Sequence, residues 1–117
     1  MLPRRLRLKR PKDFAAVRRG GKRWRDNLVS LNVLPNGLPH SRFGFIISHS
    51  VGTAVRRNRI KRRLHAAVRG WLPAIQGGYD VVVIAHGAIA AAQYDEIVAA
   101  LGRLFKQAGI LTGNRSP

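Results

Sequence analysis

The densest group of chemically capable side chains in this 117-residue chain lies in residues 55–64. Six cationic side chains and one asparagine share these ten positions with three apolar residues. Polyanion binding is the chemistry that such a run can perform, because arginine makes bidentate contacts with phosphate and stacks on bases. The polar members of the run are Arg56, Arg57, Asn58, Arg59, Lys61, Arg62 and Arg63.

The run also keeps its apolar residues at helical spacing. At about 100° per residue, an apolar stripe forms within about one quadrant of the helix, and the cations lie outside it. The stripe consists of Ile60, Leu64, Ala67, Val68 and Trp71. Asn58, Arg62 and Arg69 fall on the opposite side, and the remaining cations flank both edges. Because like charges four residues apart repel, we expect a helix docked by its stripe and neutralised by a polyanion.

The net charge of +17 is distributed unevenly. Residues 1–70 contain 19 of the 22 Lys and Arg but only two of the five acids, so residues 71–117 are balanced. An excess of this size opposes compaction and is typical of proteins with a polyanionic partner. The predominance of arginine favours nucleic acid over a membrane surface. A basic surface that serves only solubility is the weaker alternative.

Several classes of protein are excluded by composition. The chain contains no cysteine, which excludes disulfide scaffolds and thiolate metal sites. Its longest strongly apolar run, residues 81–85, is too short to cross a bilayer, and the basic N-terminus lacks the apolar core of a signal peptide. We therefore expect a cytoplasmic protein without membrane association.

The chain offers no convincing active site. Only Asp95 and Glu96 are neighbours among the five acids, and adjacent helical residues do not face one point. The four histidines lack metal-ligand spacing, and the Ser48-His49-Ser50 run lacks an orienting acid. We predict no catalytic residue and no metal ligand.

The remaining pattern predicts one α+β domain over residues 1–117. A basic arm (1–12), anchored by three leucines, precedes a helix that ends at Gly20, and residues 110–117 form a flexible tail. Alternation predicts strands over 28–34 and 42–48, paired as a hairpin. A continuous apolar run predicts a central strand over 79–85, covered on both faces. Two further helices follow, one capped by Thr53 and fading near residues 70–73, the other ending at Gly109.

Residues 52–64, with the sequence GTAVRRNRIKRRL, resemble the signature of the protein subunit of bacterial ribonuclease P. Other segments agree in order: Lys12-Asp13-Phe14, residues 43–48 (FGFIIS), residues 79–85 (YDVVVIA) and residues 94–97 (YDEI). The resemblance covers roughly residues 6–109.

The resemblance implies a single-domain sandwich of α-β-β-β-α-β-α order with a left-handed βαβ crossover, a fold of the ribosomal protein S5 domain 2-like type. The pattern yields only three strands, so residues 43–51 are expected to split into two strands or to extend differently. The resemblance also implies an endonuclease subunit that helps a catalytic RNA to remove the 5′ leader from precursor tRNA. Magnesium and the active site then belong to the RNA, the protein binds no cofactor itself, and no obligate protein partner is expected.

The resemblance further implies that the polar residues of 56–63 contact the catalytic RNA or lie near the leader. A cleft for the single-stranded leader is expected at Phe14, Arg18, Leu31, Phe43, Ser48 and His49. Relatives often carry an aromatic residue at the position of Arg18, a tyrosine near Leu31 and lysines at His49-Ser50. Leader binding is therefore predicted to rely more on arginine and less on stacking.

Two other functions compete with this interpretation. A structural ribosomal protein would explain the charge and the small size, but not the Arg57-Asn58-Arg59 helix. A nuclease acting without RNA would need clustered carboxylates, which the sequence does not predict.

Overall fold

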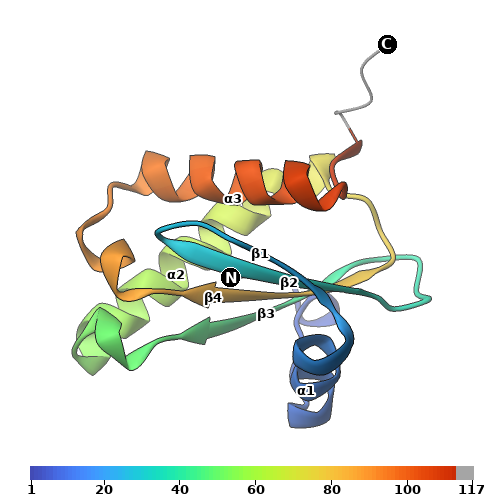
Figure 1. The fold of residues 1–117 in the computed structure, drawn as a ribbon, viewed down its shortest axis with the longest axis horizontal. Helices are drawn as coiled ribbons and strands as arrows, with labels where there is room; N and C mark the ends of the chain where they lie inside the picture. The colour runs from blue at the N-terminus through green and yellow to red at the C-terminus, as the bar shows by residue number, and fades with distance from the viewer. Residues whose placement is uncertain (113–117) are drawn as a thin grey trace.

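The structure, a computed structural model, describes residues 1–112. Its principal elements follow the order α-β-β-β-α-β-α, with short 3-10 turns between them (Figure 1). This arrangement confirms the predicted single α+β domain. The elements are α1 (Pro11–Gly20), β1 (Lys22–Arg25), β2 (Val29–Pro35), β3 (Arg42–Ile47), α2 (Ala54–Trp71), β4 (Tyr79–Ala85) and α3 (Tyr94–Ala108).

The four strands form one mixed sheet in the order β1-β2-β4-β3. Strand β4 pairs antiparallel with β2 and parallel with β3, so α2 is the predicted crossover between parallel neighbours. The predicted hairpin between β2 and β3 is wrong, because β4 lies between them. The physical reason for the central place of β4 is burial. Val81, Val82 and Val83 are all fully buried, and successive residues can all be buried only in a strand that is covered on both faces.

Strand β1 was not predicted. It has one apolar residue, Trp24, among three exposed cations, and it forms an edge of the sheet as the hairpin partner of β2. Residues 43–51 do not split into two strands, because β3 is one continuous strand that ends at Ile47, and the strand that the pattern lacked is β1.

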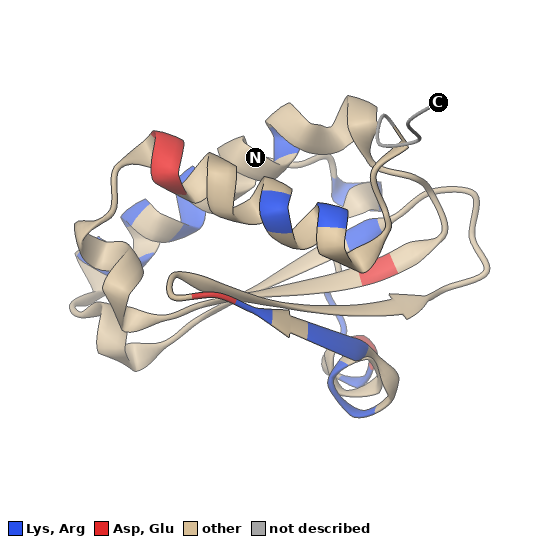
Figure 2. Cartoon of the chain, turned by 45° about the horizontal axis from the view of Figure 1, so that its top comes forward, with Lys and Arg blue, Asp and Glu red and all other residues tan. Residues whose placement is uncertain are grey.

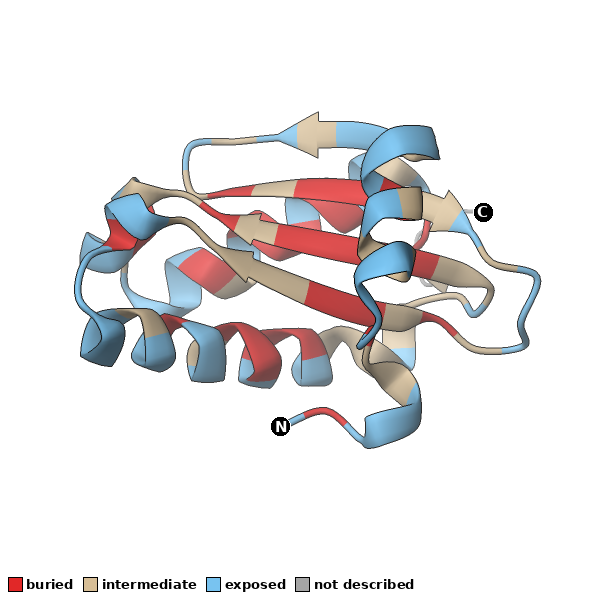
Figure 3. Cartoon of the chain, turned by 90° about the horizontal axis from the view of Figure 1, so that it is seen from below, coloured by how far each residue is buried: buried red, intermediate tan, exposed pale blue. Residues whose placement is uncertain are grey.

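Helices cover the two faces of the sheet unequally (Figures 1 and 3). The main core lies between the sheet and the pair α2 and α3, and a smaller cluster of Leu8, Val17 and Val82 lies under α1. In α2 the predicted stripe residues Ile60, Leu64, Ala67 and Val68 are buried, and Trp71 is half-buried. The helical periodicity therefore predicted correctly which face of α2 is docked.

Both ends of the described chain are packed against the domain. In the arm, Leu2 and Leu8 are buried and Leu6 is half-buried. The expected flexible tail is wrong at its start, because Ile110 and Leu111 are buried and the Thr112 hydroxyl donates to the Ala74 carbonyl at 3.1 Å. The rest of that expected tail, 113–117, lies outside the described residues. No helix within residues 1–112 is long and apolar enough to cross a membrane.

Candidate nucleic-acid interface

Helix α2 presents most of its cations to solvent. Its first turn is capped by Thr53, whose hydroxyl accepts from the Arg56 backbone N–H at 3.3 Å. Because the apolar stripe faces the sheet, the polar positions opposite it point outward. The exposed polar side chains of the run are Arg56, Asn58, Arg59, Lys61 and Arg62. Figure 2 shows cations on α2, β1 and α1, while acidic residues are sparse there.

Arg57 differs from the other cations of α2. Its side chain is half-buried, and Nη2 donates to the Ile47 carbonyl at 3.1 Å, where β3 ends. This bond ties the first turn of α2 to the sheet. Its Nε is buried and has no hydrogen-bond partner among the described residues, so one donor of the guanidinium remains unsatisfied.

The opposite face of the sheet is only partly covered. Figure 3 shows α1 crossing one end of the strands and leaving the other end open. The cross-strand register places Arg25, Ser30, Ile84 and Ile46 in one row across all four strands. This row, continued by His86 after β4 and Ser48 after β3, is called the open strip below. Arg25 is exposed and the other members are half-buried, so the strip is accessible from solvent.

A hollow of about 280 Å³ lies between the open strip and α1. On its floor, the Ser30 hydroxyl and His86 Nε2 are 2.6 Å apart. Asn32 is only 1% exposed, and its Nδ2 is buried without a partner among residues 1–112. The lining residues are Arg18, Arg23, Trp24, Arg25, Ser30, Asn32, Ile84 and His86. The hollow therefore combines neutral hydrogen-bonding groups at its floor with arginines at its rim.

The imidazole of His86 is held in its neutral form. Burial lowers its pKa, the Arg25 charge lowers it further, and Asp26 opposes the change. A neutral imidazole can form a hydrogen bond with the Ser30 hydroxyl. The positive charge of the hollow then comes from its arginines alone.

Phe14 lies against the backbone of β3. A Cβ atom added at Gly44 would lie 2.5 Å from two carbons of the Phe14 ring, so the ring occupies space that only glycine leaves free. Phe14 lines a second hollow, of about 190 Å³, which also contains Phe45, Lys61 and His65. Phe14 and Arg18 lie one helical turn apart along α1. Phe14 lines this second hollow, whereas Arg18 lines the hollow beside the open strip.

Two of the residues predicted to line a leader cleft are misplaced. Leu31 and Phe43 are both 0% exposed and belong to the core beneath α2 and α3, so the prediction is wrong for them. Alternation along β2 turns Leu31 inward and turns Ser30 and Asn32 towards the open strip. The polar residues at positions 30 and 32 indicate which side of the strand faces the open strip. The predicted set of leader-cleft residues nevertheless named Leu31 and missed Asn32.

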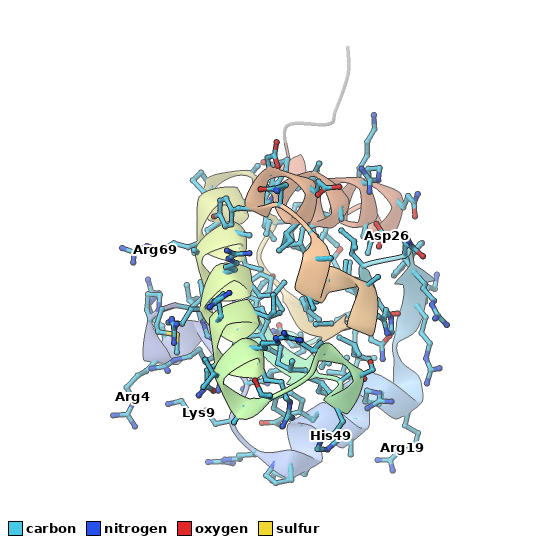
Figure 4. All side chains as sticks on the ribbon, turned by 90° about the vertical axis from the view of Figure 1, so that its left-hand side faces the viewer. Arg4, Lys9, Arg19, Asp26, His49 and Arg69 are labelled. Atoms are coloured by element: carbon cyan, nitrogen blue, oxygen red, sulfur yellow. The ribbon has the colours of Figure 1, made fainter. Side chains whose placement is uncertain are left out.

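Ser48 and His49 lie at the rim of the open strip, where β3 leads into α2. The Ser48 hydroxyl accepts from the Ser50 backbone N–H at 3.2 Å and caps a short 3-10 turn. His49 is exposed, and Figure 4 shows it and Arg19 at the same edge of the molecule, next to α1. The structure thus places Arg18, Ser48 and His49 around the sheet face that carries the open strip. Phe14 lies at the border of this face, against the backbone of β3.

The acidic residues do not assemble into a metal site in the part of the chain that the structure describes. Within residues 1–112, no group of three or more acidic or histidine side chains could hold a metal ion. Asp80 instead accepts from Arg42 Nη2 at 2.7 Å and from Asn36 Nδ2 at 2.9 Å. Asp80 serves the fold, because both of its carboxylate oxygens are engaged by neighbouring side chains.

Comparisons with known proteins agree with this geometry. The family model described as Ribonuclease P matches residues 2–109. The chain is 40% identical to the ribonuclease P protein component of Roseiflexus castenholzii, covering 96% of this chain and 93% of the relative. It is 38% identical to the component of Synechocystis, covering 98% and 94%.

Solved structures show the same fold. A mutant ribonuclease P protein of Staphylococcus aureus superimposes with a TM-score of 0.84 at 26% identity, covering 91% of this chain and 90% of that one. The ribonuclease P protein of Thermotoga maritima gives a TM-score of 0.79 at 27% identity, covering 86% and 96%. The predicted fold class and the resemblance stated from residues 52–64 are both confirmed. The chain belongs to the bacterial ribonuclease P protein family, and is thus an RNA-binding subunit of the ribonucleoprotein enzyme that matures the 5′ ends of tRNA.

Proposed function

We propose that α2 binds the catalytic RNA of ribonuclease P and that the open strip binds the single-stranded 5′ leader of precursor tRNA. The observation that carries this division is that the two cationic surfaces lie on opposite faces of one sheet. Helix α2 covers one face, and the open strip with its arginine rim occupies the other. One protein can therefore contact two RNA segments at once, in the cytoplasm where tRNA is processed.

The open strip suits a single strand better than a duplex. Bases of a single strand are free to enter a hollow, where unpaired edges can be read by hydrogen bonds. The half-buried Ser30–His86 pair supplies polar groups there, and the Asn32 amide, which is buried and has an unsatisfied donor, lines the same hollow. Arg18, Arg23 and Arg25 at the rim are placed to neutralise phosphates.

The catalytic RNA suits the exposed side of α2. The outward cations lie on a rigid helix, so they can engage phosphates without reordering the backbone. Arg56, Arg59, Lys61 and Arg62 are exposed, and Arg63 is half-buried at one edge of the helix. Since the described acids form no candidate site for hydrolysis, the reaction chemistry and its magnesium ions are assigned to the RNA.

The first test is cleavage of precursor tRNA at low magnesium by a bacterial ribonuclease P RNA alone, the protein alone and the two together. We expect cleavage at the mature 5′ end only in the mixture, because the protein offsets phosphate repulsion that magnesium would otherwise screen. Cleavage by the protein alone would contradict the assignment of the active site to the RNA. Association with ribosomes in place of this RNA would favour a structural ribosomal protein.

The leader site is tested by the pair Arg18→Ala and Arg19→Ala. Both residues are exposed neighbours on α1, but only Arg18 lines the hollow, so each variant removes one charge from a different environment. We expect Arg18→Ala to reduce the preference of the holoenzyme for leader-bearing over mature tRNA about fivefold, on the order of 1 kcal/mol. The Arg19→Ala variant should retain most of the preference for leader-bearing tRNA. If Arg18→Ala weakened only binding of the catalytic RNA, the leader assignment would be wrong.

A further inference from the structure

The N-terminal arm is an ordered part of the domain. Leu2 and Leu8 are buried, and the Leu8 backbone N–H donates to the Phe43 carbonyl at 2.8 Å. Arg7 forms a parallel bridge with Phe43, so the arm follows the outer edge of β3. The arm therefore fixes the position of its cations before any partner binds, which reduces the entropy lost on binding.

The cations of the arm surround a hollow of about 440 Å³ with little opposing charge. Among residues 1–112, only Arg42 and Arg103 form ion pairs, and Arg42 is already engaged by Asp80. The only acid that lines the hollow is Asp13. The lining residues are Arg4, Arg5, Arg7, Lys9, Arg10, Lys12, Asp13 and Arg42.

The cations of the arm lie close enough to affect one another. The pKa of Lys9 is lowered by loss of hydration and by the charges of Arg4 and Arg7. Figure 4 shows Arg4 and Lys9 projecting on the same side of α2 as Arg69. The repulsion among these positive charges is relieved when an anionic RNA strand enters the hollow.

The hollow of the arm continues into the first turns of α2. Arg7 and Lys9 also line the neighbouring hollow that contains Phe14 and Phe45. That hollow in turn shares Phe45 and Lys61 with a third one, of about 260 Å³, beside Arg57 and Asn58. The three hollows are therefore neighbours along the outer edge of β3, where the arm lies, and together they are called the edge track below.

Two arginines of the edge track carry unsatisfied donors. The Nε atoms of Arg7 and Arg57 are buried and have no hydrogen-bond partner among the described residues. Arg7 belongs to the arm, and Arg57 belongs to α2, so these donors occur in two separate parts of the track. A buried N–H without a partner is costly. These Nε atoms are closed to solvent as they stand, so each side chain must reorient before its Nε can donate to a phosphate oxygen, an acceptor to which guanidinium groups are well suited.

We propose that the edge track binds one strand of the catalytic RNA, with the arm contacting phosphates beyond those held by α2. The track is distinct from the leader site, because it shares no lining residue with the hollow of the open strip. The half-buried Phe45 lies in its middle and offers aromatic surface for a base, while Phe14, predicted for the leader cleft, lines the same hollow at the border with the open strip. This inference rests on the proposed binding of the catalytic RNA by α2 and extends that contact to the arm.

The test compares two double variants of the full-length protein, Lys9→Gln with Lys12→Gln and Lys22→Gln with Lys106→Gln. Each removes two exposed lysines, but only the first pair lines the track; Lys22 lies on β1 at the opposite edge of the sheet, and Lys106 on α3. Affinity for the isolated catalytic RNA is measured over a range of salt concentrations. We expect the arm variant to bind about tenfold more weakly near physiological salt, with a salt slope shallower by about 1.5, because each contact with single-stranded phosphate contributes about 0.7.

The control variant should change both quantities by less than half as much. Equal effects of the two variants, or no effect of the arm variant, would overturn the proposal. A loss confined to the preference for leader-bearing substrate would assign the track to the leader and overturn it as well. Arg59→Gln, which lies outside the track, separates the two hypotheses: if it too leaves RNA affinity unchanged, the proposed role of α2 itself fails.

Discussion

Phe14 owes its position to the absence of a side chain at residue 44. The Cβ of an alanine there would lie 2.5 Å from the Phe14 ring and 3.1 Å from the Leu8 Cβ, so both neighbours would have to move. We expect Gly44→Ala to destabilise the protein by about 1–3 kcal/mol, as overpacked cores do. Urea unfolding measures this loss. Displacement of Phe14 should also weaken binding of RNA at the edge track.

Gly70→Ala is the matched control for this substitution. Gly70 lies in α2, is exposed, and has no atom within 4 Å of an added Cβ. Alanine is favoured over glycine in a helix, so this variant should be more stable by roughly 0.5–1 kcal/mol. If Gly44→Ala proved as stable as the parent protein, the close approach of Phe14 to the strand would be disproved.

At the scale of elements, the arm is attached to α2 by a buried histidine. His65 Nδ1 accepts from the Leu2 backbone N–H at 3.4 Å, and its ring lies 4.3 Å from that of Phe45. Burial lowers the pKa of His65 to about 4, and the charges of Lys61, the N-terminus and Arg7 act in the same direction. The folded protein therefore keeps this imidazole neutral, which is the form that accepts the bond.

This attachment predicts a specific pH dependence of stability. Between the ordinary histidine pKa of 6.5 and the folded value of about 4, the unfolded chain binds more protons at this position. Stability is therefore present above pH 6.5 and lost as the pH falls towards 4. We expect His65 to account for about 1–2 kcal/mol of the loss between pH 6.5 and 5. Urea unfolding of His65→Gln should lack this component, and His49→Gln, at an exposed position, should retain it.

The elements could be predicted where the signal is local. Helix α1, helix α2 with its Thr53 cap, and β4 have their predicted bounds to within a few residues, because capping and periodicity act over neighbouring positions. Strand β1 and the pairing of β2 could not be predicted in the same way. Strand β1 has one apolar residue among three cations, so no alternation marks it, and the pairing of β2 with β4 joins distant parts of the chain.

At the scale of the whole molecule, the two RNA surfaces differ in how far the sequence predicts them. The cations of α2 are contiguous in the chain, so their exposure follows from one helix and one apolar stripe. The hollow beside the open strip is lined from α1, β1, β2 and β4, and its composition depends on strand order and register. The prediction of Leu31 in place of Asn32 shows the consequence, since a shift of one residue moves a side chain to the other face.

Because the edge track and the open strip share no lining residue, the protein should use them independently. A triple variant that joins Arg18→Ala to Lys9→Gln and Lys12→Gln tests this at the level of the holoenzyme. We expect its affinity for the catalytic RNA to equal that of the arm variant, and its preference for leader-bearing substrate to equal that of Arg18→Ala. Independent sites usually add within about 0.3–0.5 kcal/mol. A coupling well above 1 kcal/mol would instead mean that one RNA strand crosses from the track to the strip around Phe14, and that the two faces act as a single site.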